Sequence, residues 1–319
     1  MSIPAIYYLC SDHDSPTGGF KMIYRHVELL SDNGFPAYVL HKNKPFRCTW
    51  FEHHAPLAYL SDFSLTDKDY LVFPEAWGPL ISEVGKGIKK VIFNQNAYYT
   101  FDGYTLDKQN KTTPYVHPDT AAAITVSEDA MDYLAYVFPQ LKTYHVRNAI
   151  CPDIFSFSEK KQKQISFMTR KNRPQLEQVI NILKFRNVLE DFELVPIENK
   201  NEKDVAAILK ESLIFLSFGY PEGFNLPAAE AMSSGCLVIG YHGNGGRKFF
   251  LPEFSWPIQT GSVIDFARTV EQVLQWVRLQ PGEMDHKRRK ASEHICTHYS
   301  KDCMKEELLS AWKEIVYGV

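Results

Sequence analysis

The chain carries, at residues 220–235, the stretch YPEGFNLPAAEAMSSG, which lies between two short apolar runs, LIFLSF at 213–218 and CLVIG at 236–240. Apolar runs of this length are typical of buried strands. Pro227 suits the first turn of a helix because its missing N–H would be unpaired there, and Gly235 suits the left-handed residue after the last turn. The stretch therefore predicts a strand, a loop, a short helix and a second, parallel strand.

Two glutamates lie in this unit, Glu222 on the loop and Glu230 on the predicted helix. Taken alone, Glu222 is best explained as a surface charge on a loop, and Glu230 as a carboxylate that interacts favourably with the helix dipole in an early turn. However, open α/β sheets bind ligands at the carboxyl ends of their strands, and free N–H groups at a helix N-terminus favour anions. The position of the loop therefore favours a binding site for an anionic ligand.

Length and composition limit the number of domains and the classes of partner. The chain has 319 residues, of which 45% are hydrophobic, and at roughly 150 residues per domain this length predicts two domains. A net charge of −3 and a pI near 6.4 disfavour binding to nucleic acid. The six cysteines are scattered without metal-ligand spacing, which favours buried free thiols and a reducing cytoplasm. No apolar window is long enough for a transmembrane helix.

Two successive α/β series are expected along the chain. In the first, apolar strands alternate with helical patterns, and a polar segment at 156–163 has the composition of a linker. We place the boundary at residue 155, with domains at 1–155 and 156–319 and with the last helix free to pack back on the first domain. The second series predicts helices at 175–183, 203–211, 263–279 and 301–316. A cleft between two such domains is a common small-molecule site.

The segment from Glu222 to Gly240 resembles the E-x7-E motif of retaining GT-B glycosyltransferases, in particular family four. The resemblance is strongest from Ile165 to Phe250 and includes the glycine-rich run 243–247. It implies two Rossmann-like α/β/α domains whose parallel sheets face each other across a cleft. It also implies metal-independent, retaining transfer of a sugar from a nucleotide diphosphate-sugar to a glycan, lipid or small-molecule acceptor held by the first domain. No further cofactor is expected.

The resemblance implies roles for individual residues. Glu230 would bind the two vicinal hydroxyls of the ribose, through charge-assisted hydrogen bonds worth roughly 1.5–3 kcal/mol each. Glu222 would contact the donor sugar near the reacting carbon. Backbone N–H groups of the residues that follow Glu222 would face the phosphates. The expected donor-binding residues between the two glutamates are Gly223, Phe224, Asn225 and Leu226, and the glycines Gly18 and Gly19 resemble the family's N-terminal loop.

Cations that face the leaving diphosphate would lower the barrier, as oxyanion-hole donors do. Arg170 matches the family's arginine, whereas either Lys171 or Arg173 can fill the second cationic role. Related enzymes often carry a histidine after a middle strand of the first domain. This chain has Asn94 and Gln95 there, which position a hydroxyl but do not titrate near neutral pH.

The sequence leaves several alternative functions open. One is a non-catalytic GT-B-like protein that binds a nucleotide or a glycan and acts in an assembly, and another is a sugar-nucleotide epimerase. The run Asp12-His13-Asp14 is typical of solvated turn residues rather than of a metal site. The basic run Lys287–Lys290 is typical of a solvated helix face, with peripheral contact to the inner membrane face as the lesser alternative. The donor's base and sugar, the acceptor and the oligomeric state stay open.

Overall fold

The computed structural model describes residues 3–62, 65–109 and 111–318. It divides into two compact units: unit 1 comprises Met1–Asn148 with Met304–Val319, and unit 2 comprises Ala149–Cys303. The division falls at Asn148, before the boundary expected at residue 155, and the end of the chain belongs to unit 1.

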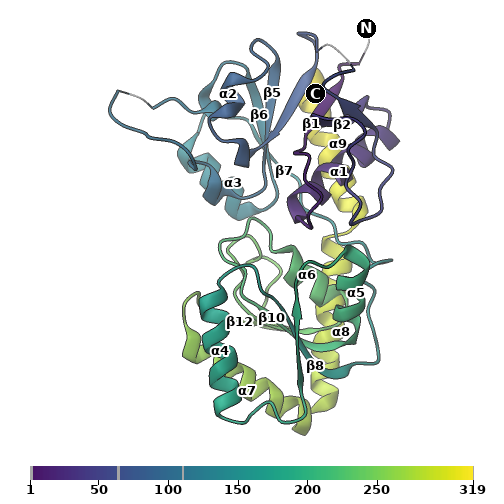
Figure 1. Cartoon of the computed structure of the whole chain (residues 1–319), viewed down its shortest axis with the longest axis vertical. Helices are drawn as coiled ribbons and strands as arrows, with labels where there is room; N and C mark the ends of the chain where they lie inside the picture. Colours follow the sequence, from purple (N-terminus) through teal and green to yellow (C-terminus); the bar gives the residue numbers. More distant parts are fainter. Residues whose placement is uncertain (1–2, 63–64, 110, 319) are drawn as a thin grey trace. The chain divides into compact units, whose positions relative to one another are not determined.

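Unit 1 contains, in its described residues, a seven-stranded parallel sheet in the order β3-β2-β1-β4-β5-β6-β7 (Figure 1). The strands are β1 (Ile6–Leu9), β2 (Ala37–His41), β3 (Leu57–Tyr59), β4 (Tyr70–Pro74), β5 (Lys89–Asn94), β6 (Thr120–Thr125) and β7 (Thr143–His145). The helices are α1 (Gly18–Asp32), α2 (Leu80–Glu83), α3 (Glu128–Val137) and α9 (Lys301–Tyr317), with short 3₁₀ turns η1 (Glu75–Trp77), η2 (Ala97–Tyr99) and η3 (Pro114–Val116).

Helix α9, drawn in yellow in Figure 1, belongs to unit 1 for a packing reason. Trp312 is fully buried, and its indole N–H donates a hydrogen bond to the Tyr8 hydroxyl on β1 at 3.1 Å. Its ring also packs edge-on against Tyr70 on β4, with centroids 5.6 Å apart. A large buried aromatic ring contributes strongly to a core, so this helix completes the core of unit 1.

Unit 2 contains, over the residues described, a five-stranded parallel sheet in the order β12-β11-β10-β8-β9. The strands are β8 (Gln162–Met168), β9 (Glu193–Ile197), β10 (Ser212–Ser217), β11 (Leu237–Gly240) and β12 (Trp256–Pro257). The helices are α4 (Arg173–Phe185), α5 (Glu202–Glu211), α6 (Leu226–Ser233), α7 (Val263–Leu279) and α8 (Pro281–His298). The strand, loop, helix and strand expected around Glu222 are β10, α6 and β11.

Each sheet has a topological switch point, where the chain reverses the direction in which it adds strands. In unit 1 the switch point lies between β1 and β4, because β2 and β3 extend the sheet on one side and β5 to β7 on the other. In unit 2 it lies between β8 and β10. Ligands of open α/β sheets bind at the carboxyl ends of the strands that flank such a point.

The basic run on α8 has a structural role that the sequence did not indicate. Arg288 is 5% exposed, its guanidinium lies 4.7 Å above the Phe157 ring, and it donates hydrogen bonds to the carbonyls of Ser158 and Glu159 at 2.7 and 2.8 Å. The interpretation of the whole run as a solvated face is therefore wrong for Arg288, which secures the segment before β8. None of the helices within the described ranges is long and apolar enough to cross a membrane.

Candidate functional site

The loop that carries Glu222 is locked against the glycine-rich loop that follows β11. The Glu222 N–H donates to the Gly243 carbonyl at 2.8 Å, and the Gly245 N–H donates to the Glu222 carbonyl at 3.1 Å. A Cβ atom on Gly243 would lie 2.6 Å from the Cβ of Glu222, and one on Gly245 would lie 2.0 Å from the Gly223 carbonyl oxygen. Because any side chain there would force the loops apart, both glycines are required for the approach that sets the Glu222 backbone.

Lys171 and Glu222 meet at the switch point of unit 2. The Lys171 ammonium lies 3.0 Å from Glu222 Oε2 and donates a hydrogen bond to the Pro221 carbonyl at 2.6 Å. Both side chains keep about a fifth of their surface exposed, 22% for the lysine and 20% for the glutamate. The loop after β8 thus holds the loop after β10 through a partly solvated ion pair, which a ligand can reach.

Asn172 ties the same two loops together through hydrogen bonds. Its backbone is left-handed, with φ of 50°, and it precedes the first residue of α4. Its side-chain N–H group donates to the carbonyls of Phe218 and Tyr220 at 2.7 and 3.2 Å. Asparagine tolerates the left-handed region better than most residues, and the two bonds fix how Lys171 leaves the strand.

The turn after β8 and the start of α4, residues 169–173, form a basic turn with three cations, and its two arginines lie in different surroundings. Arg173 is the first residue of α4, is largely exposed, and its Nε lies 2.9 Å from Glu177 Oε1 one turn along the helix. Arg170 is exposed at the carboxyl end of β8, and no ion pair engages its guanidinium among the residues that the structure describes. Of the two alternatives for the second cation, Lys171 lies beside Glu222, whereas Arg173 pairs on the helix surface.

The residues after Glu222 are anchored by their side chains, which sequence reasoning missed. Phe224 is buried against Phe249 and Tyr299, with ring centroids 5.2 and 5.4 Å away. Asn225 is 3% exposed and left-handed, and its side chain donates to Ser217 Oγ and to the Tyr241 carbonyl, both at 3.1 Å. These contacts hold the loop to the ends of β10 and β11. Helix α6 then begins at Leu226 with Pro227 in its first turn, as expected.

Glu230 lies within a helix that is buried almost throughout. It is 6% exposed, and residues 228–233 of α6 are all buried. A carboxylate in such surroundings costs free energy unless it is hydrogen-bonded, so it is rarely retained without a polar partner. Glu230 is therefore not a solvated carboxylate on the helix surface.

The glycines Gly18 and Gly19 are the first two residues of helix α1, rather than part of the preceding loop as the sequence predicts. A Cβ atom on Gly19 would lie 3.2 Å from Gln95 Nε2 and 3.3 Å from Oε1. The first turn of α1 therefore packs directly on the Gln95 amide. Gln95 follows β5, so this contact lies at the carboxyl edge of the unit 1 sheet.

Glu75 lies at the same edge, directly after β4, and sequence reasoning missed it. It is 5% exposed, and its Oε2 accepts a hydrogen bond from the Gln95 N–H at 2.8 Å. Burial raises the pKa of the Glu75 carboxyl to about 7, against backbone N–H donors that lower it. The available signal was an acidic residue directly after an apolar strand at a switch point.

Asn94, by contrast, faces the interior. It is fully buried, and its side-chain N–H group donates to Thr100 Oγ1 at 3.1 Å and to the Tyr115 hydroxyl at 2.7 Å. Asn94 therefore fixes the segment after β5, whereas its neighbour Gln95 is half-buried and accessible.

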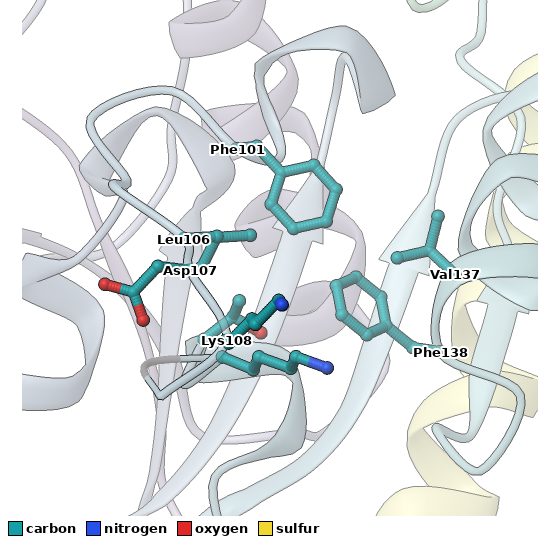
Figure 2. A pocket seen from close by; sticks show the side chains of 8 residues that line it. Phe101, Leu106, Asp107, Lys108, Val137 and Phe138 are labelled. Carbon is teal, nitrogen blue, oxygen red and sulfur yellow. The ribbon is translucent and has the colours of Figure 1, made fainter.

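A hollow of about 580 Å³ lies elsewhere on unit 1 (Figure 2). Phe101 and Phe138 border it, and Phe138 also stacks on Tyr115 at 4.7 Å. Because α3 leads from the carboxyl end of β6 toward the amino end of β7, its last residue, Val137, places the hollow away from the carboxyl edge of the sheet. Phe101 therefore borders this hollow and not the switch point.

Comparisons with known proteins identify the fold. No family model matches the chain. The alpha-1,6-glucosyltransferase of Actinobacillus pleuropneumoniae serotype 7 (strain AP76) is 25% identical over 244 residues, which are 74% of this chain and 72% of that protein. The sucrose-phosphate synthase of Thermosynechococcus elongatus superposes with a TM-score of 0.69 at 11% identity, over 99% of this chain and all of the other.

A third comparison is with Anabaena HepE, solved in complex with UDP and glucose. It superposes with a TM-score of 0.64 at 10% identity, over 98% of this chain and 100% of that chain. The solved structures establish the GT-B fold, with its two parallel sheets. The relative from Actinobacillus is a glucosyltransferase, the class of enzyme that the glutamate motif predicts. The chain is a nucleotide-sugar-dependent GT-B glycosyltransferase, similar to the retaining enzymes of family four.

Proposed function

We propose that the chain transfers glucose from UDP-glucose to a hydroxyl group of a carbohydrate acceptor, with retention at the anomeric carbon. The observation that carries this proposal is the Lys171–Glu222 pair at the switch point between β8 and β10. A cation and a carboxylate side by side match a donor that presents a diphosphate next to sugar hydroxyls. The choice of UDP and glucose is supported by the Anabaena structure and by the activity of the Actinobacillus relative.

Each donor group has a chemically suitable partner in unit 2. The Glu222 carboxylate accepts hydrogen bonds from glucose hydroxyls, and Lys171 and Arg170 stabilise the diphosphate as its negative charge grows. Glu230 accepts from the ribose hydroxyls. The backbone N–H groups of Gly223 and Phe224 face the phosphates. The Asn225 side chain anchors this loop by its hydrogen bond to Ser217. Leu226 supports the loop as the first residue of α6.

In the reaction, the bond between the glucose anomeric carbon and the β-phosphate oxygen breaks, and a bond to the acceptor oxygen forms on the same face. The acceptor proton moves to the departing phosphate oxygen. No side chain of unit 1 needs to act as a base, which suits a chain with Gln95 where related enzymes often carry a histidine. Fixed cations stabilise the leaving group, so we expect no requirement for a divalent metal.

The test is a donor panel. The purified protein is incubated with UDP-, GDP- and ADP-glucose and with methyl α-glucoside as acceptor, and nucleoside diphosphate release is followed with and without EDTA. UDP release that persists in EDTA, with an α-configured product by NMR, supports the proposal. No release with any donor, together with thermal stabilisation by UDP, favours the non-catalytic nucleotide-binding protein. Interconversion of the sugar without UDP release favours an epimerase.

A further inference from the structure

One buried acid in unit 1 has no part in the donor chemistry. Glu75 opens the turn η1 directly after β4, at the switch point between β1 and β4. Its side chain is almost fully enclosed. No lysine, arginine or histidine pairs with it in the part of the chain that the structure describes. A buried carboxyl group of this kind needs another source of stabilisation.

Backbone N–H groups supply that stabilisation. Glu75 accepts hydrogen bonds from the backbone of Gln95, at 2.8 Å, and from the backbone N–H groups of Asn96 and of Glu75 itself. Gln95 and Asn96 form the turn that follows the neighbouring strand β5. Glu75 therefore fixes the path of the chain at the point where it leaves β5.

The turn that Glu75 holds presents a single accessible side chain. Asn94, Asn96 and Ala97 are buried, whereas Gln95 is half-buried. The Gln95 amide packs on Gly19 in the first turn of α1, and no side-chain hydrogen bond engages it among the described residues. An amide both donates and accepts hydrogen bonds, so it can bind a neutral hydroxyl group in either sense.

We propose that Glu75 is a positioning residue for the sugar acceptor: it holds the turn so that the Gln95 amide binds an acceptor hydroxyl beside the N-terminus of α1. This inference rests on the proposed glycosyl transfer and adds the neutral hydroxyl-binding group of unit 1. The positions of both residues support it: Glu75 follows β4, which flanks the switch point, and Gln95 follows the neighbouring strand β5. Ligands of open α/β sheets bind at this carboxyl edge, near the switch point. A side chain at Gly19 would contact the amide tightly and shift it by a few tenths of an ångström.

The chain offers a matched control at the other end of β4. Asp69 is also buried, at 9% exposure, and also accepts backbone hydrogen bonds, from Ala5 at 3.2 Å and Thr66 at 2.8 Å. It precedes β4, so it lies at the amino edge of the sheet. Asp69→Asn removes a comparable buried carboxylate that accepts backbone hydrogen bonds, and it leaves the Gln95 turn unchanged.

The experiment measures steady-state transfer from UDP-glucose to methyl α-glucoside for Gln95→Ala, Glu75→Gln, the double variant and Asp69→Asn. We expect Gln95→Ala and Glu75→Gln each to raise the KM for methyl α-glucoside about tenfold, the size of one lost hydrogen bond, with the KM for UDP-glucose unchanged. The double variant should lose no more than the larger single effect, because Glu75 acts through Gln95. Asp69→Asn should leave the acceptor KM unchanged, whatever it costs in melting temperature.

Three outcomes overturn the inference. One is an unchanged acceptor KM in Gln95→Ala, and the second is additive effects of the two substitutions, which would show that Glu75 acts independently of Gln95. The third is a wild-type protein that neither transfers to methyl α-glucoside nor binds it by saturation-transfer NMR in the presence of UDP. Two measurements in the same samples report on the donor site separately. They are the binding of UDP and the hydrolysis of UDP-glucose, in which water replaces the sugar acceptor. A failure of this inference is thereby distinguished from a failure of the proposed function.

Discussion

The two switch points of this protein use the same sheet topology for different chemistry. In unit 2, Lys171 and Glu222 form a partly exposed ion pair at 3.0 Å. In unit 1, Glu75 is buried against backbone N–H groups, and the accessible group is the neutral Gln95 amide. A diphosphate leaving group gains negative charge during transfer and requires cations, whereas an acceptor hydroxyl requires only orientation. The difference agrees with the proposed charged donor site and the proposed neutral acceptor site.

The largest effect is expected at Glu222, in the charged pair of unit 2. Glu222→Gln removes the charge that faces Lys171 and weakens the contacts to the donor sugar. We expect kcat to fall about 100-fold, as for the loss of an important transition-state contact, while the Kd for UDP changes by less than about threefold. Glu177→Gln, a change at an exposed glutamate on α4, is the control. A kcat within about twofold of wild type would contradict the assignment of Glu222.

Glu230 tests the donor site without touching the ion pair. Glu230→Ala should raise the KM for UDP-glucose about 30-fold, equivalent to roughly 2 kcal/mol of lost charge-assisted hydrogen bonding, with a smaller effect on kcat. Isothermal titration with UDP measures the same loss without catalysis. Because Glu230 is buried, circular dichroism must first confirm that the variant folds. Equal UDP affinity in the folded variant would remove Glu230 from the ribose site.

The three cations of the basic turn are expected to contribute unequally to donor binding. Arg170→Met and Lys171→Met should each lower kcat/KM for UDP-glucose about tenfold, because each removes one charge from the diphosphate site. Arg173→Met should stay within about twofold, since Arg173 pairs with Glu177 on the surface of α4. The three variants are matched in size. A loss at Arg173 equal to that at Lys171 would reopen the choice of the second phosphate cation.

The smallest expected effect concerns stability, and it is specific to unit 1. The pKa of Glu75 is raised from its ordinary value of 4.5 to about 7, so the folded state binds its proton more tightly than the unfolded state. The associated stability is fully present below pH 4.5 and is lost as the pH rises through 7. The buried Tyr115 is the titratable neighbour whose interaction with Glu75 is described, and its own pKa is raised far above this window.

Glu75→Gln removes this titration. We expect the melting temperature of the wild type, relative to that of Glu75→Gln, to fall as the pH rises from 5 to 8. The corresponding loss in the free energy of unfolding is on the order of 1 kcal/mol or more. Differential scanning calorimetry at both pH values measures it, with Asp69→Asn as control. A difference in melting temperature that is independent of pH would contradict the raised pKa.

Elements with strong local signals were predicted well. The helix expected at 263–279 is α7, Val263–Leu279, and the apolar runs on either side of the glutamate motif contain β10 and β11. Short strands such as β12, Trp256–Pro257, were missed because two residues carry no detectable periodicity. Strand β8 begins at Gln162, inside the segment expected to be a linker. The prediction missed this start because the first two residues of the strand are exposed and polar.

In the candidate site, too, local relations were predictable from the sequence and contacts between distant segments were not. The glutamates and the Gly-Phe-Asn loop lie in one local unit, so their relation was visible in the sequence. The side-chain anchors of Phe224 and Asn225 were not, because their partners, such as Tyr299 and Tyr241, lie on other elements. Arg288 was misinterpreted for the same reason, since its partners belong to the segment before β8.

The α/β class, the donor motif and the GT-B resemblance were all predictable from residue order, because they depend on single strand–helix units. Three contacts became visible in the folded protein: Lys171 faces Glu222, Glu75 holds the Gln95 turn, and the last helix completes the core of unit 1. Each of these contacts joins strands or loops distant in sequence. Strand order creates the contacts, and local hydrophobic periodicity carries no record of strand order.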